Sequence, residues 1–276
     1  MTNETPAGDG AEEILAVNDI TVTYRRPGRS LLTAVDGVSL SLRRSEVLGL
    51  VGESGCGKST TARAVCGLEP LTSGSVLFNG EPVSPLSMKR RPKHLLGIQM
   101  VFQNPYASLN PRRRIGSQIE DGLGLNRQRD AWNVNELLEK VGLHPSDRDK
   151  YPHQFSGGQR QRIAIARAIG TGPDLLIGDE PIASLDASLQ QRVAALMRDL
   201  AIQAGSGLLF ISHDLAIVRT IADRVAVMNR GIIEEEGPVD TVWRHPTSAY
   251  ARRLLAAIPV ADGLGKLPGL PTRRQN

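Results

Sequence analysis

The stretch that decides the fold is Gly52-Glu53-Ser54-Gly55-Cys56-Gly57-Lys58-Ser59. It follows the apolar run 46–51, which predicts a buried parallel strand, and it precedes residues 58–66, which predict a helix. The fixed positions match the phosphate-loop pattern GxxxxGK[ST], and a strand followed by a helix is the context that this pattern requires. The alternative of a dinucleotide fingerprint needs a third glycine where Thr60 stands.

The chemistry of this loop suits nucleotide phosphates. Its glycines let backbone N–H groups turn inward around phosphate oxygens, and the helix N-terminus adds unpaired donors and a favourable dipole. We expect Lys58 to reach the β- and γ-phosphates and Ser59 to bind Mg²⁺.

A second motif is the apolar run 175–178, which ends in two carboxylates, Asp179 and Glu180. At the carboxyl end of a strand, Asp179 is placed to hold the Mg²⁺ shell through water. Glu180 is placed to orient or deprotonate an attacking water. An acidic pair alone is usually solvated, so this interpretation depends on the phosphate loop before it.

A third motif is Phe155-Ser156-Gly157-Gly158-Gln159-Arg160-Gln161-Arg162. Ser156 is a suitable N-cap for a helix over 159–169, and the two glycines permit close backbone approach. Such a helix N-terminus points donors at an anion. As a bare pattern, however, Ser-Gly-Gly is a common turn.

In this order the three motifs resemble those of ATP-binding-cassette (ABC) ATPases, and the resemblance covers about residues 14–259. It implies an α/β P-loop NTPase core with a β-rich N-terminal subdomain and an inserted helical subdomain. It also implies that ATP and Mg²⁺ are the cofactors. Gln103 then contacts Mg²⁺ and the attacking water, His213 contacts the γ-phosphate, and Tyr24 stacks on adenine.

The ATP-contacting residues that we expect from the motifs and the resemblance form one set. They are Tyr24, Gly52, Glu53, Ser54, Gly55, Cys56, Gly57, Lys58, Ser59, Thr60, Ser156, Gly157, Gly158, Gln159 and Asp186. The expected catalytic residues are Glu180, His213 and Gln103, and the expected metal ligands are Ser59, Gln103 and Asp179.

The chain departs from the family pattern after Glu180. The family usually reads Pro-Thr-Ser-Ala-Leu-Asp there, whereas this chain reads Pro181-Ile182-Ala183-Ser184-Leu185-Asp186. Because that segment normally communicates between two ATP sites, the departure leaves open how equally the two sites work. Phe155, where leucine is usual, is a milder change at an apolar position.

Two further stretches, 101–111 and 245–259, resemble oligopeptide and dipeptide importer ATPases, a group that includes nickel importers. The resemblance implies a head-to-tail dimer with a second ABC ATPase, identical or different. It also implies two transmembrane permease subunits and, indirectly, an extracytoplasmic binding protein. Some relatives carry a C-terminal cysteine cluster for iron–sulfur. The two cysteines here, Cys56 and Cys66, both precede residue 70, so we expect none.

Composition limits the other function classes. Thirty-three basic residues face 29 acidic ones, and the net charge is only +4. We therefore expect no nucleic-acid partner, and short basic runs suit an anionic membrane surface equally well. No apolar run is long enough to span a bilayer and the polar N-terminus is not a signal peptide. We expect a peripheral protein on the cytoplasmic face of the cell membrane.

The domain organisation follows from these patterns. We expect a disordered N-terminus at 1–13 and an ABC ATPase domain at 14–260. Within that domain lie a helical insertion at about 104–168 and an importer-type extension at about 237–260, and a flexible tail follows at 261–276.

Two alternatives to transport stay open. One is an importer-like ATPase recruited into a soluble enzyme complex, such as one for phosphonate breakdown. The other is a DNA-repair or translation factor. Those factors usually carry long coiled coils, zinc cysteines or a second cassette, and this sequence shows none of these.

Overall fold

The computed structural model describes residues 12–257 except 26–30, 88–90, 105–107, 127–131 and 184. Most of the predicted N-terminal disordered segment, all of the predicted C-terminal tail, and residues such as Tyr106 and Pro259 lie outside the described residues. The first strand is β1 (Glu13–Tyr24).

A six-stranded sheet forms the centre of the protein, with the strand order β10-β9-β3-β8-β7-β6. Neighbouring strands from β9 to β6 are parallel, and only β10 is antiparallel to its neighbour. The strands are β3 (Val47–Val51), β6 (Ile98–Phe102), β7 (Leu175–Asp179), β8 (Gly207–Ile211), β9 (Arg224–Asn229) and β10 (Ile232–Pro238). The apolar runs of β3, β7 and β8 are buried along their whole length, as expected for parallel strands.

Successive residues of these strands enter two different hydrophobic cores. Leu208 and Phe210 of β8 pack in one core, whereas Leu209 and Ile211 pack in the other, since side chains alternate across a strand. The first core also contains residues of α4 (Gly157–Gly170), α5 (Ala187–Gln203) and α6 (Leu215–Ile221). The second contains residues of α1 (Lys58–Val65) and of the N-terminal sheet.

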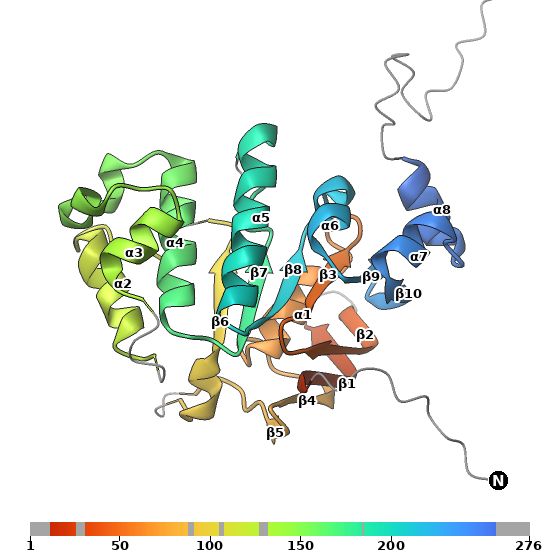
Figure 1. The fold of residues 1–276 in the computed structure, drawn as a ribbon. Helices are drawn as coiled ribbons and strands as arrows, with labels where there is room; N and C mark the ends of the chain where they lie inside the picture. Colours follow the sequence, from red (N-terminus) through yellow and green to blue (C-terminus); the bar gives the residue numbers. More distant parts are fainter. Residues whose placement is uncertain are drawn as a thin grey trace, which may run out of the picture.

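The N-terminal sheet is antiparallel and has the order β2-β1-β4-β5. Besides β1 it contains β2 (Leu32–Arg43), β4 (Ser73–Phe78) and β5 (Glu81–Pro82). The predicted β-rich N-terminal part is thus a separate layer, and α1 lies between it and the central sheet (Figure 1). Within β2, Gly37 adopts a positive φ of 63° and the register with β1 shifts, so the strand does not show a regular alternation.

The predicted helical block contains α2 (Ile115–Leu123) and α3 (Val134–Lys140), which pack against α4. Short 3-10 turns lie at His94–Gly97, Pro145–Asp149 and Pro152–Gln154. In Figure 1 these helices lie at the β6 end of the central sheet, while α7 (Val239–Arg244) and α8 (Ala249–Ala256) lie at the β10 end. The phosphate loop and the Asp179–Glu180 pair follow β3 and β7, which lie between these two ends.

The sequence did not predict the helices α6, α7 and α8 or the strands β5 and β10. The helices are short, and β10 carries three consecutive carboxylates that disguise a strand. Each carboxylate has a partner: Glu234 accepts from Asn229, Glu235 from the backbone of Thr247 and Ser248, and Glu236 pairs with Arg224.

Candidate functional site

The predicted site residues converge because the parallel strands end in one row. In the pairing register, Phe102 lies opposite Asp179, and Asp179 lies opposite Ile211. Ile211 in turn lies opposite Leu50, one residue before the end of β3. The residues that follow these strands are therefore neighbours, and the edge formed by the carboxyl ends of strands is where ligands bind in open α/β sheets.

The phosphate loop leaves β3 through glycines that no other residue could replace without a shift. A Cβ on Gly52 would stand 2.1 Å from the Met228 carbonyl oxygen, and one on Gly57 would stand 2.3 Å from that of Ala34. Both glycines also adopt positive φ angles, 152° and 116°. Backbone contact with β9 and β2 thus fixes the path of the loop.

Lys58 begins α1 and is only 4% exposed. Its Nζ donates to the carbonyl oxygens of Gly52 and Glu53, both at 2.8 Å, so the ammonium is held inside the loop. The N-cap, Gly57, provides no side-chain cap. The first N–H groups of α1 therefore remain available to an anion, which is the arrangement that suits phosphate.

Ser59 and Asp179 meet across the gap between α1 and β7. The Ser59 hydroxyl donates to Asp179 Oδ1 at 2.7 Å, and Asp179 is 6% exposed. Burial raises the pKa of Asp179, although the hydrogen bond from Ser59 works in the opposite direction. A hydroxyl and a buried carboxylate in contact are hard oxygen donors of the kind that Mg²⁺ prefers.

These two residues fit Mg²⁺ together with nucleotide phosphates rather than a metal cage made by protein alone. Among the residues that the structure describes, no group of three or more His, Cys, Asp or Glu side chains is arranged to hold a metal ion. Mg²⁺ is commonly bound by one or two protein ligands plus substrate phosphates and water, so this sparse set is sufficient.

Glu180 and His213 face each other at the ends of β7 and β8. His213 Nδ1 lies 3.3 Å from Glu180 Oε2, and the Glu180 N–H donates to the Ile211 carbonyl at 3.1 Å. Glu180 has a φ of 47°, a left-handed conformation that is uncommon for a non-glycine residue. Backbone strain of this kind occurs often at functional sites.

A cavity of about 400 Å³ brings together nine of the predicted residues. Its lining includes Lys58, Ser59, Gln103 and Glu180, together with Tyr24. Burial raises the pKa of the Tyr24 phenol. The predicted ATP contacts that line this cavity are Tyr24, Ser54, Gly55, Gly57, Lys58, Ser59 and Thr60.

Three predicted loop contacts do not line this cavity. Gly52 is pressed against Met228, and Cys56 is buried with the second hydrophobic core. The Glu53 N–H is bound by the Tyr250 hydroxyl instead. These three residues therefore shape the loop from behind, and the sequence pattern alone could not separate them from residues that face the cavity.

The Ser-Gly-Gly-Gln motif forms a helix N-terminus outside that cavity. Ser156 is the N-cap of α4, which starts at Gly157 rather than at the predicted 159, and Gln159 completes a capping box. Gly157 has open space where a Cβ would stand and no unusual φ. Nothing in the described part of the chain therefore requires glycine at this position.

Asp186 also lies outside the lining of the cavity. It is the N-cap of α5, where it accepts from the Leu189 N–H and the Ser188 hydroxyl, and these bonds lower its pKa. The unusual Ile182 is buried, and its carbonyl accepts from Gln190. Ser184, in the same segment, lies outside the described residues.

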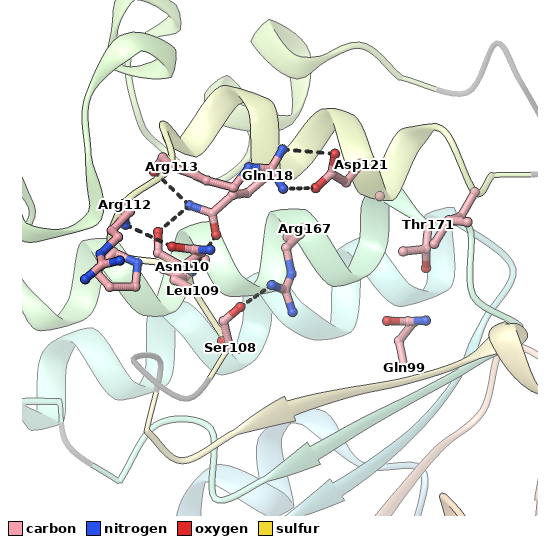
Figure 2. Close-up of a pocket in the computed structure, with 13 residues that line it drawn as sticks. Gln99, Ser108, Leu109, Asn110, Arg112, Arg113, Gln118, Asp121, Arg167 and Thr171 are labelled. Carbon is pink, nitrogen blue, oxygen red and sulfur yellow. Dashed lines mark hydrogen bonds and ion pairs between the residues drawn. The ribbon is translucent and has the colours of Figure 1, made fainter. Parts of the chain in front are cut away.

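A second and larger cavity, of about 820 Å³, separates β6 from the helical block (Figure 2). Gln118 fixes its rim by bonding the backbone of Asn110 and Arg113, while Arg113 pairs with Asp121. At its base, Arg167 donates to the Ser108 carbonyl, and burial lowers the pKa of its guanidinium. Sequence reasoning pointed to this region but did not single out Gln118 or Arg167, which belong to no motif.

Comparison with known proteins identifies the family. A family model described as "ABC transporter" matches residues 35–183, more than half of the chain. The chain is also 46% identical over 265 residues to a putative peptide import ATP-binding protein of Brucella abortus. That alignment covers 92% of this chain and 79% of the relative. This chain belongs to the ABC transporter family.

Other relatives agree with this assignment. The oligopeptide transport ATP-binding protein OppF of Bacillus subtilis is 44% identical, over 91% of this chain and 84% of its own length. The di/tripeptide transport ATP-binding protein DppF of Pseudomonas aeruginosa is 44% identical, over 90% of this chain and 80% of its own length. The predicted resemblance to ABC ATPases is confirmed, and the chain is an ATP-binding ATPase of the ABC type.

Solved ABC structures have the same fold. The ATP-binding cassette MJ0796, in a dimeric post-hydrolysis state with ADP and Pi, gives a TM-score of 0.70 at 26% identity. The superposition covers 82% of this chain and 99% of the MJ0796 chain. CbiO1 of Clostridium perfringens is described as part of the ABC transporter complex cbiONQ. It gives a TM-score of 0.69 at 27% identity, over 85% of this chain and 92% of the CbiO1 chain. The predicted α/β fold of an ABC ATPase is thus confirmed.

Proposed function

We propose that this chain is the ATP-hydrolysing subunit of a membrane importer for dipeptides or oligopeptides. The observation that carries this proposal is the similarity, over about nine-tenths of the chain, to proteins named for peptide import. The functional residues that follow the neighbouring parallel strands support the proposal that the chain hydrolyses ATP. The larger cavity beside the helical block supports a coupled partner.

In the proposed nucleotide site, Lys58 and the N-terminus of α1 hold the phosphates, and Tyr24 contacts the adenine. Ser59, Asp179 and Gln103 hold Mg²⁺, which when bound neutralises charge on the phosphates. Glu180 orients or deprotonates the attacking water, with His213 beside its carboxylate. The closeness of Ser59 to Asp179 and of Glu180 to His213 supports these roles.

A second chain completes each site. The Ser156 N-cap and the open Gly157 present helix donors outside the cavity that contains Lys58. We therefore propose a head-to-tail dimer in which the Ser156 region of one chain contacts the γ-phosphate held by the other. The similarity to a dimeric cassette supports this arrangement. The second chain is either another copy or a related ATPase.

The larger cavity is the proposed contact with the permease subunits (Figure 2). Its lining residues Ser108 and Asn110 follow Gln103 closely in the chain, and Gln103 lines the nucleotide cavity. A displacement at this contact is therefore transmitted to the nucleotide cavity through few residues. Gln161 adds a second link, because its Nε2 in α4 donates to the Phe102 carbonyl at 3.3 Å.

Among the described parts of the chain, no helix combines the length and apolar character that crossing a membrane requires. Attachment through permease subunits at the cytoplasmic face of the membrane is therefore part of the proposal, as is an extracytoplasmic binding protein acting upstream. The alternative of a soluble enzyme complex has the same ATP chemistry and differs only in its partners.

The test is purification of the tagged full-length chain from mild detergent, followed by identification of the proteins bound to it. The proposal predicts two integral membrane subunits and peptide-stimulated ATP hydrolysis in the purified assembly. Lys58→Ala serves as the control, since it should leave the assembly intact and abolish turnover. Recovery with soluble enzymes alone would favour the alternative.

A further inference from the structure

The phosphate loop is contacted by a residue far away in sequence, at the C-terminal end of the described chain. Tyr250, in α8, accepts a hydrogen bond from the backbone N–H of Glu53 at 3.2 Å. Its side chain is 7% exposed and packs in the core that also contains Val51 and Val227, from the two strands beside the loop. The hydroxyl is thus the polar tip of an otherwise buried side chain.

The helix that carries Tyr250 is itself fixed to the central sheet. Its N-cap, Ser248, accepts from the Ala251 N–H at 2.9 Å, and Ala251 is fully buried. The carboxylate of Glu235 in β10 accepts the N–H groups of Thr247 and Ser248 at 2.8 and 2.9 Å. Tyr250 is therefore held in place by the sheet edge formed by β10 rather than by the loop that it contacts.

Both backbone polar groups of Glu53 are hydrogen-bonded. Its N–H donates to the Tyr250 hydroxyl, and its carbonyl oxygen accepts from the ammonium of Lys58. Glu53 does not line the nucleotide cavity, whereas Lys58 does. Tyr250 therefore contacts the loop from behind and leaves the N–H groups on the cavity side available for phosphate.

We propose that Tyr250 is a positioning residue for the phosphate loop, which it holds through the Glu53 N–H in the conformation that receives ATP. The inference rests on the proposed nucleotide site and is independent of what the assembly transports. Without the hydroxyl, the first peptides of the loop lose an anchor. ATP binding must then order the loop, and this cost lowers the affinity for ATP.

The test compares Tyr250→Phe with the wild-type chain by calorimetric titration with ATP and by steady-state ATP hydrolysis. Phenylalanine keeps the buried ring and removes only the hydroxyl. The Kd and KM for ATP should rise about two- to tenfold, the range expected for one lost hydrogen bond. The kcat at saturating ATP should stay at its wild-type value, because Tyr250 touches no reacting group. Arg253→Ala, an exposed change on the same helix, should leave all three constants unchanged.

Glu235→Gln is a second variant that leaves Tyr250 intact and weakens the anchor of α8. It should raise the Kd in the same direction. The double variant should raise the Kd for ATP by less than the product of the two separate fold-changes, because both substitutions act through one contact. If Tyr250→Phe does not fold, Glu235→Gln alone decides the question.

An unchanged Kd for ATP in the folded variants, with or without a lower melting temperature, would overturn the inference and leave Tyr250 a packing residue. A fall in kcat at unchanged Kd would overturn it as well. Lys58→Ala separates this failure from failure of the site itself. If Lys58→Ala still binds ATP with wild-type affinity, the nucleotide site is wrongly placed. If it loses ATP while Tyr250→Phe does not, only the positioning role is wrong.

Discussion

The imidazole Nδ1 of His213 lies 3.3 Å from a carboxylate oxygen of Glu180, at the ends of two neighbouring parallel strands. Glu180 is 19% exposed and His213 is 56% exposed, so the carboxylate lies inward and the imidazole covers it. This places Glu180, the proposed general base, next to a group that can fix its orientation. The pair connects β7 and β8 at the cavity that contains Lys58.

Glu180→Gln should therefore separate ATP binding from hydrolysis. The amide keeps the shape of the side chain but cannot accept a proton, so kcat should fall by about 10²–10⁴-fold while the Kd for ATP stays the same. The dimer should accumulate with ATP bound, which size-exclusion chromatography with ATP would detect. The exposed Glu139→Gln is the matched control and should be fully active. Turnover by Glu180→Gln at the original rate would contradict the assignment.

Gly157→Asp tests the shared site. The glycine has open space around it and starts α4, where an acidic side chain is favourable for the isolated helix. We expect a stable chain that binds ATP but does not hydrolyse it, because the carboxylate repels the γ-phosphate presented by the other chain. The checks are melting temperature, ATP affinity and turnover of the variant alone.

Mixing Gly157→Asp with Lys58→Ala sharpens this test for a dimer of identical chains. Each variant alone has two broken sites. A mixed head-to-tail dimer has one site with both defects and one site with neither, so equal mixing should restore about a quarter of the wild-type sites. Absence of any recovery, with mixed dimers shown to form, would argue against a site shared between chains. If the natural partner is a different ATPase, the same cross applies to that pair.

The two cysteines should differ in reactivity. Burial raises the pKa of Cys66 to about 12, so at pH 8 only about one thiol in ten thousand is a thiolate. Cys56, in the phosphate loop, lies 3.7 Å from the Lys58 ammonium. Mass spectrometry after alkylation of the native protein should find Cys66 unmodified, and ATP should slow any modification at Cys56. Rapid labelling of Cys66 in the folded chain would contradict this account.

The Glu235 carboxylate gives a pH dependence whose sign follows from its bonds. Burial alone would raise its pKa, but the N–H groups of Thr247 and Ser248 outweigh this and lower it. A depressed folded-state pKa stabilises the protein above the ordinary glutamate pKa, and that stability is lost as pH falls through the depressed value. Glu235→Gln should therefore melt at a lower temperature than wild type at pH 7, and the difference should shrink toward acidic pH. A pH-independent difference would show that the charge is not responsible.

Much of the site could be predicted because its residues follow buried strands. An apolar run ending in Gly52 or in Asp179 shows both the strand and the edge at which its functional residues lie. The N-cap role of Ser156 was equally visible, because capping depends on a residue and its next few neighbours. Local patterns with a local cause were therefore predicted well.

The rest depends on contacts between distant residues. No pattern near Glu53 shows that its N–H is bound by Tyr250, almost two hundred residues later. The carboxylates of β10 look like a solvated run until their partners are known. The rim of the larger cavity depends on Gln118, a single buried glutamine in an amphipathic helix. Such features require the fold before they can be recognised.

The most direct test of the central claim is uptake of a labelled dipeptide or oligopeptide by cells or inverted membranes that carry the assembled transporter. Wild-type chain should support ATP-dependent uptake, and Glu180→Gln should abolish it while leaving the assembly and its ATP binding intact. Equal peptide uptake with the wild-type and Glu180→Gln chains would contradict the account that ATP hydrolysis by this chain powers peptide import.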